Sequence, residues 1–205
     1  MRPLLWGRVI LHVGMGLFCL WVALEFLTSF QELICTGLIF ASLALIEGLR
    51  FNISTFNDWV LNVGSVLAHR HEENRITSAT WFWTAIFPVS LIQSELVLAL
   101  TLAVLSLGDQ AGSFVGRRFG TITLLNGRSL QGTLAFIFSS AILCWVMLTT
   151  YFPSLSAQET FWLSLVPPMS GGLTELFCSK IDDNFGVGIA TGLITWATTC
   201  LLGLY

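Results

Sequence analysis

One carboxylate, two adjacent arginines and four evenly spaced glycines occur together in the stretch GDQAGSFVGRRFG, residues 108–120. The carboxylate of Asp109 is a hard oxygen ligand of the kind that Mg²⁺ prefers, and Mg²⁺ commonly binds through one or two carboxylates plus substrate phosphates. Arg117 and Arg118 carry planar guanidinium groups that match phosphate oxygens. The stretch therefore predicts a site for a phosphate ligand that is bound through a metal ion.

The glycines of this stretch recur every four residues, at Gly108, Gly112, Gly116 and Gly120. On a helix they form one stripe of small residues, which lets two helix backbones approach closely. Glycine also lets a phosphate reach backbone N–H groups, so Gly116 and Gly120 are candidate phosphate contacts, with helix packing as the alternative. The spacing matches neither the GxGxxG dinucleotide fingerprint nor a P-loop, which requires GK[ST].

A second polar stretch, NGRSLQGTLAF at residues 126–136, precedes a long apolar run. Arg128 falls beside the loop that holds the first two arginines, and Ser129 is a candidate ligand next to it. The hydroxyl of Ser129 or Thr133 could instead cap the helix that follows.

A third stretch, GGLTELFCSKIDDNFGVG at residues 171–188, carries Glu175, Asp182, Asp183 and Asn184. Glu175 lies two turns before Asp182, so we expect both on one side of a helix end. Ionisable groups at the edge of an apolar segment usually line a polar cavity with a function.

Carboxylates with a metal ion and arginines are the equipment of phosphoryl or nucleotidyl transfer, where positioning and charge neutralisation do most of the work. The candidates divide by role. Those for catalysis are Asp109 and Asp183; those for metal binding are Asp109, Glu175, Asp182 and Asp183; those for the nucleotide are Arg117, Arg118, Arg128, Ser129, Asn184, Gly116 and Gly120.

The composition indicates an integral membrane protein, because only 10% of the 205 residues are charged and 55% are hydrophobic, whereas soluble domains carry about 25% charged residues. We expect an all-α fold, a single domain over residues 1–205 built as a polytopic bundle of about seven transmembrane helices. The segments 79–93 and 95–108 are short and could instead form one broken helix or a re-entrant pair. The apolar segments fall at 9–28, 33–49, 79–93, 95–108, 133–152, 160–178 and 186–205.

All lysines and arginines fall in the N-terminal segment and in the predicted loops 50–78, 109–132 and 179–185. Because positively charged loops stay cytoplasmic, we expect a cytoplasmic N-terminus and a site that faces the cytoplasm, in a bacterial inner membrane or an equivalent one. The acids Glu25, Glu32, Glu95 and Glu159 lie toward the opposite face and are expected to be interfacial.

The three polar stretches resemble consecutive motifs of the CTP-dependent lipid-alcohol kinases, the group of dolichol or polyprenol kinase, phytol kinase and yeast-type diacylglycerol kinase, which is related to the phosphatidate cytidylyltransferases. The family forms are D-x-x-A-x-x-x-G-R-x-x-G, K-S-x-E-G-[ST] and E-x(6)-[DN]-D-N. The start RVILHVGMG, with Arg8 and His12, and the segment IEGLR, with Glu47 and Arg50, also resemble family segments, as does AHRHEENRITSATWF at residues 68–82.

The chain departs from the second motif, because Arg128 and Gln131 stand where the family has lysine and glutamate. Arginine can bind phosphate but cannot replace a lysine that donates a proton. Gln131 keeps a hydrogen bond and loses a charge, which leaves a metal role there in doubt.

The resemblance implies transfer of the γ-phosphate of CTP, with Mg²⁺ as cofactor, to the hydroxyl of a membrane lipid alcohol such as a polyprenol or dolichol, phytol or diacylglycerol. The nearest alternative is a cytidylyltransferase that makes a CDP-lipid. A small transporter is the less favoured alternative, because no trail of polar residues crosses the bilayer. No nucleic acid is expected as a partner, and a homo-oligomer is left open.

Overall fold

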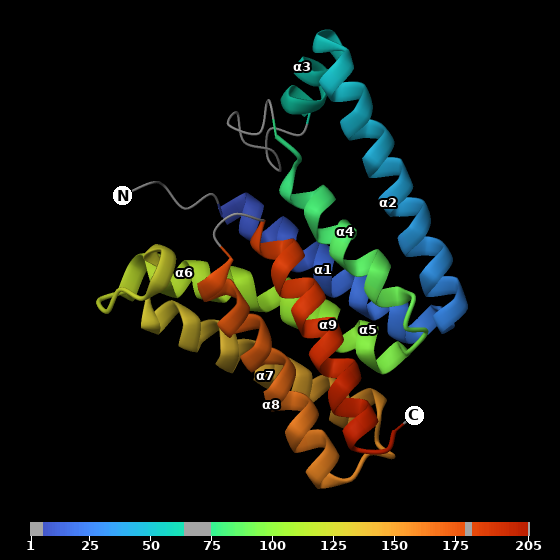
Figure 1. Ribbon diagram of the computed structural model, residues 1–205, viewed down its shortest axis with the longest axis vertical. Coiled ribbons are helices and arrows are strands. Elements are labelled where there is room, and N and C mark those ends of the chain that lie inside the picture. The colour runs from blue at the N-terminus through green and yellow to red at the C-terminus, as the bar shows by residue number, and fades with distance from the viewer. Residues whose placement is uncertain (1–5, 64–74, 179–181, 205) are drawn as a thin grey trace.

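A computed structural model describes residues 6–63, 75–178 and 182–204, and within them the fold is all-α, as the sequence predicts (Figure 1). The predicted loop 50–78 is partly helical, since α3 follows α2 directly, and residues 64–74 lie outside the described ranges. The elements are α1 (Trp6–Phe26), α2 (Ser29–Asn52), α3 (Ser54–Val63), α4 (Ser78–Ser90), α5 (Glu95–Ala103), the π-helical turn η2 (Val104–Gly108), α6 (Asp109–Phe119), the 3₁₀ turn η3 (Leu125–Gly127), α7 (Leu130–Tyr151), α8 (Ala157–Phe177) and α9 (Asp183–Leu201).

The elements α5, η2 and α6 form one continuous helix, Glu95–Phe119. The predicted loop 109–132 is therefore wrong for its first half, because Asp109–Phe119 is helical and the helix ends only where the Gly120 N–H donates to the Gly116 carbonyl at 3.1 Å. Polar residues made this stretch look like a loop, but its glycines allow it to pack closely on α7. The segments 79–93 and 95–108 are separate helices joined by a turn, in which Gln93 adopts a φ of 58°.

Three helices of the described residues are long and apolar enough to cross a membrane, namely α2, Glu95–Phe119 and α7. Large apolar side chains such as Leu38, Phe138 and Ile142 are exposed on them, as expected for helices in contact with lipid. These features support an integral, multi-pass membrane protein. The count of seven spans and the orientation stay predictions.

The helix Glu95–Phe119 lies at the centre of the molecule, and every residue from Val97 to Leu105 is buried. It contacts α1, α7, α8 and α9. Small residues bring these neighbours close: a Cβ on Gly171 of α8 would lie 3.0 Å from Val104, and one on Gly188 of α9 would lie 3.1 Å from Leu105. The central helix thus fixes where Asp109 emerges from the core.

A buried polar network ties the far end of α2 to α3 and α4, the part that projects at the top of Figure 1. Arg50 donates to Glu47 Oε2 at 2.7 Å and to Asn57 Oδ1 at 3.0 Å. The other Glu47 oxygen accepts from the Thr77 N–H and the Thr80 hydroxyl, both at 3.0 Å. The network satisfies the buried charges of the IEGLR segment, which gives that segment a structural role.

The expectation that Glu32 is interfacial is wrong, because only 2% of Glu32 is exposed. α2 packs against α4, and Glu32 lines a cavity of about 260 Å³ between α1, α2, α4 and α5, together with apolar side chains including Phe18, Trp83 and Leu98. The periodicity of α2 did not reveal this burial, because it depends on which helices pack there.

Candidate active site

Three carboxylates from three helices converge on one point. Asp109 begins α6, Glu175 lies in the last turn of α8 and Asp183 begins α9, and one oxygen of each lies within 4.8 Å of the others. Glu175 is buried, with 3% of its side chain exposed, while Asp109 and Asp183 are half-buried. Three acids at this separation repel one another, so the arrangement requires a compensating positive charge.

Arg128 supplies one such charge. Its Nη1 lies 2.8 Å from Glu175 Oε1, and its Nη2 donates to the carboxylate of Asp183. Burial disfavours the charged guanidinium, but Glu175 and Asp183 outweigh this effect and raise the pKa of Arg128 above its usual value. Arg128 therefore stays protonated and joins the end of α8 to the start of α9.

A pocket of about 250 Å³ opens beside the carboxylates, between α6 and α7, and Glu175 and Arg128 form part of its wall. Arg117 also lines it, and so does Thr133, whose Oγ1 is buried and has no hydrogen-bond partner among the described residues. A buried hydroxyl without a partner is costly, so Thr133 Oγ1 is a hydrogen-bonding group that a polar ligand in the pocket would satisfy. The remaining wall is formed by Gly112, Ser113, Gly116, Gly127, Ser129 and Gly132.

The glycine stripe shapes this pocket by letting α6 approach α7. A Cβ on Gly112 would lie 3.2 Å from the carbonyl oxygen of Gly132, and one on Gly116 would lie 3.0 Å from Ser129 Oγ. Gly108 continues the contact, since its Cβ would lie 2.6 Å from Ser140 Oγ. The packing expectation for the stripe is therefore confirmed, and Gly112 and Gly116 also line the pocket. Contact of Gly116 and Gly120 with phosphate stays a prediction.

Several predicted site residues make local structural contacts. Ser129 caps α7 by accepting from the Gly132 N–H at 3.1 Å, as the alternative for its hydroxyl proposed. Asp182 caps α9 by accepting from the Asn184 N–H at 3.0 Å. Burial and the neighbouring Asp183 raise the pKa of Asp182 to about 6.

Glu175 and Asp182 do not share a helix end. The expectation was wrong because α8 ends at Phe177 and α9 begins only at Asp183. It is Asp183, not Asp182, that meets Glu175 and Asp109 in the described cluster. Residues 179–181, with Lys180, lie outside the described ranges.

The remaining candidates divide between the pocket and the surface. Arg117 and Arg118 are both exposed; Arg117 also lines the pocket, whereas the Arg118 guanidinium lies 5.8 Å from the centre of the Phe119 ring. Gly120 terminates α6, and a Cβ there would lie 2.2 Å from the Gly116 carbonyl oxygen. Asn184 is buried, and its Oδ1 has no hydrogen-bond partner in the described part of the chain.

Three amide contacts near the site were not predicted, one of them local and two between segments. Gln110 donates to Asp109 Oδ2 at 2.8 Å. Gln131 accepts from the Thr121 N–H at 3.1 Å, and Asn126 donates to the Leu176 carbonyl at 2.7 Å. The bonds of Gln131 and Asn126 hold the loop before Arg128 against α7 and α8, and the pattern of residues within one segment does not predict them.

No protein-family model matches the chain, and no solved structure matches it. Three curated relatives do, all called CTP-dependent diacylglycerol kinase 1. The protein from Saccharomyces cerevisiae is 24% identical over 91% of this chain and 70% of its own length. That from Eremothecium gossypii is 27% identical over 75% of this chain and 54% of its own length, and that from Schizosaccharomyces pombe is 24% identical over 72% of each.

Proposed function

Because the chain is a distant homologue of the CTP-dependent lipid kinases, we propose that it phosphorylates the hydroxyl of a membrane lipid alcohol with CTP as the donor. The observation that carries this proposal is the meeting of Asp109, Glu175 and Asp183 with Arg128 beside a pocket lined by Arg117. The relatives' names make diacylglycerol the first substrate to test.

The charge of the site supports a divalent metal. Three carboxylates and one guanidinium leave a net negative charge when all are ionised, and a triphosphate is itself an anion. The two repel each other unless cations lie between them. We therefore infer that Mg²⁺ accompanies the nucleotide.

The donor set fits Mg²⁺ by its chemistry and by its spacing. All three ligand atoms are carboxylate oxygens, which Mg²⁺ prefers, and two ligands of one Mg²⁺ lie at most about 4.2 Å apart. The three carboxylate oxygens lie within 4.8 Å of one another. Small rotations of the half-buried side chains of Asp109 and Asp183 would bring them within about 4.2 Å. The bound ion would neutralise charge on the transferring phosphoryl group.

The chain's own residues supply the other parts of the reaction. Arg117 and Arg128 would bind phosphate oxygens from the pocket wall, as arginine forks do. Asp109 would accept the proton of the lipid hydroxyl while the hydroxyl oxygen forms a bond to the γ-phosphorus. The bond from that phosphorus to the β-phosphate oxygen breaks at the same time, and CDP leaves with its electron pair.

We place this site on the cytoplasmic face of the membrane. The last turn of α6, with Arg117 and Arg118, and the loop that carries Arg128 hold most of the positive charge near it, and positively charged segments outside the bilayer are retained on the cytoplasmic side. A cysteine introduced at Leu125, in η3, should react with a membrane-impermeant maleimide only after the cells are opened.

The decisive experiment uses the purified protein in detergent micelles with diacylglycerol, a polyprenol or phytol. CTP labelled at the γ-phosphorus should transfer its label to the lipid, and CTP labelled at the α-phosphorus should not. In a parallel reaction with phosphatidate as the acceptor, transfer of the α label with release of pyrophosphate would instead identify a cytidylyltransferase. Absence of either transfer with every alcohol, with CTP and with ATP, would contradict the proposal.

A further inference from the structure

A histidine in α1 carries a buried nitrogen that nothing in the site described above accounts for. His12 Nε2 has no hydrogen-bond partner among the described residues, and the ring lies edge-on to Phe82 of α4, with 6.0 Å between the ring centroids. A buried polar atom left without a partner costs free energy. A bound ligand that hydrogen-bonds to Nε2 would remove that cost.

The packing of α1 places His12 at the level of the carboxylate cluster. A Cβ on Gly16 would lie 2.2 Å from Ser106 Oγ, so these two residues face each other across α1 and the central helix. Further along α1, Ala23 lines the same cavity as Leu98. The two helices are therefore antiparallel, and His12, one turn before Gly16, lies level with the start of α6, one turn after Ser106.

His12 and the arginine pocket lie on different sides of the central helix. Gly108 and Gly112 face α7, whereas Ser106 faces α1. Asp109 follows Gly108 directly, between the two sides, and accepts a hydrogen bond from Gln110. A donor phosphate on the α7 side and an acceptor group on the α1 side can therefore approach the same carboxylate.

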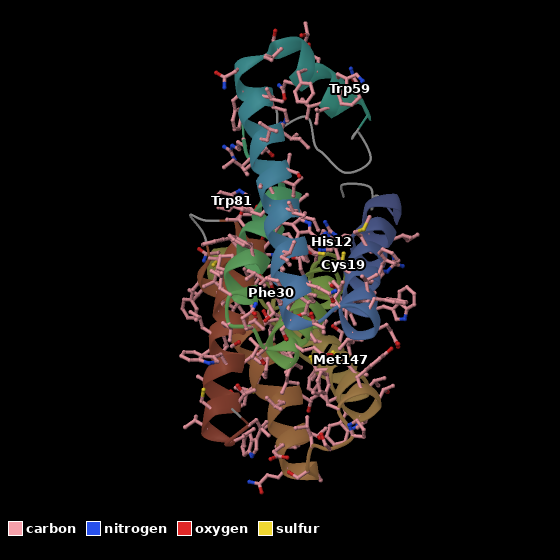
Figure 2. The ribbon with its side chains drawn as sticks, turned by 90° about the vertical axis from the view of Figure 1, so that its right-hand side faces the viewer. His12, Cys19, Phe30, Trp59, Trp81 and Met147 are labelled. Carbon is pink, nitrogen blue, oxygen red and sulfur yellow. The ribbon has the colours of Figure 1, made fainter. Side chains whose placement is uncertain are left out.

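The chemistry around His12 suits the hydroxyl of an amphiphile better than a nucleotide. Its ring neighbour is the buried Phe82, and the adjacent surface of α1 exposes Met15 and Phe18, which are apolar. Figure 2 shows His12 within the body of the molecule, below the projecting end that carries Trp59. One polar atom in apolar surroundings matches a lipid with one hydroxyl.

We propose that His12 Nε2 hydrogen-bonds to the hydroxyl of the lipid alcohol and so positions the acceptor oxygen beside Asp109. The inference rests on the proposed function, and it makes His12 a residue that binds the acceptor rather than the nucleotide. Loss of one such hydrogen bond is expected to weaken binding of the alcohol about tenfold.

The test compares His12→Phe, His12→Gln and His12→Asn with the matched control Ile10→Ala, a truncation at an exposed position of the same helix. His12→Phe should raise the KM for the lipid alcohol about tenfold and leave the KM for CTP near that of the wild type. Glutamine places its amide near the position of Nε2 and should restore much of the affinity, whereas asparagine is too short and should not. Ile10→Ala should behave as the wild type.

Binding can also be read without phosphate transfer. The lipid alcohol alone should raise the thermal unfolding midpoint of the wild type more than that of His12→Phe, and in its absence His12→Phe should be the more stable, because the unpartnered nitrogen is gone. An unchanged KM for the lipid, or an equal rise in the KM for CTP, would overturn the proposal. If the wild type transfers no phosphate, the proposed function fails. The role of His12 is then judged by binding alone, and equal stabilisation of the wild type and His12→Phe by the alcohol would overturn it. If His12→Phe does not fold, the comparison of glutamine with asparagine decides the question.

Discussion

The contact between α6 and α7 predicts a specific cost for one methyl group. In Gly132→Ala, the new Cβ would lie 2.9 Å from the Gly112 carbonyl oxygen and 3.1 Å from Gly116 Cα. Both atoms belong to the backbone, so they cannot rotate away and the two helices must separate. Overpacking of this kind costs about 1–3 kcal/mol.

Gly48→Ala is the matched control, because Gly48 is helical and a Cβ there would meet no atom within 4 Å. Both substitutions gain the same helix propensity, up to about 1 kcal/mol. The difference in stability between the two variants therefore isolates the overpacking term. At roughly 2–4 °C per kcal/mol for a chain of this size, Gly132→Ala should unfold about 2–12 °C below Gly48→Ala.

Thermal unfolding of both variants in one detergent measures this gap, and activity adds a second reading. Gly132 lines the pocket, so its variant should also lose affinity for CTP, while Gly48→Ala should bind CTP as the wild type does. Equal unfolding temperatures would refute the close contact of α6 with α7 on which the description of the pocket depends.

Three further predictions concern the charged groups. Asp109→Asn should abolish phosphate transfer while the protein still purifies as a folded membrane protein, since the amide keeps the shape and loses the base; full activity would remove Asp109 from the mechanism. Arg128→Ala should raise the KM for CTP at least tenfold, and it should lower the unfolding temperature because it leaves Glu175 buried without its ion pair. Arg118→Ala, at an exposed position, should change the KM and the unfolding temperature little. Asp182→Asn should stabilise the protein above about pH 6, because the raised pKa of Asp182 means that its ionisation disfavours the folded state there. The gain should vanish below about pH 4, where the carboxyl is neutral in both the folded and the unfolded state. Thermal unfolding measured across this pH range checks the prediction, and the same gain at every pH would show that charge is not the cause.

The helical elements were largely predictable, because apolar segments are long and polar residues separate them. The chemistry-bearing residues were also found by type, since Asp109, Arg128, Glu175 and Asp183 stand out in apolar surroundings. Which of these residues contact one another could not be predicted from the sequence. Asp183 rather than Asp182 meets Glu175 because the chain leaves α8 at Phe177 and re-enters a helix at Asp183, and the exact residue at which a helix ends is weakly encoded locally.

The burial of Glu32 and of His12 Nε2 could not be read from the sequence for a related reason. Both residues lie in apolar helices that have little amphipathic pattern, so periodicity does not indicate which side meets another helix. Burial there follows from packing of α1, α2, α4 and α5 against one another. Such contacts join segments that are far apart in the sequence.

The π-helical turn Val104–Gly108 immediately precedes Asp109 in the central helix. A turn of this kind holds about one residue more than an α-helical turn, so it sets the rotational phase of everything that follows it. If the same residues formed regular α-helical geometry instead, the one extra residue would rotate α6 by about 100° relative to α5. Asp109 would then point away from Glu175 and Asp183, although every side chain of the site would still be present.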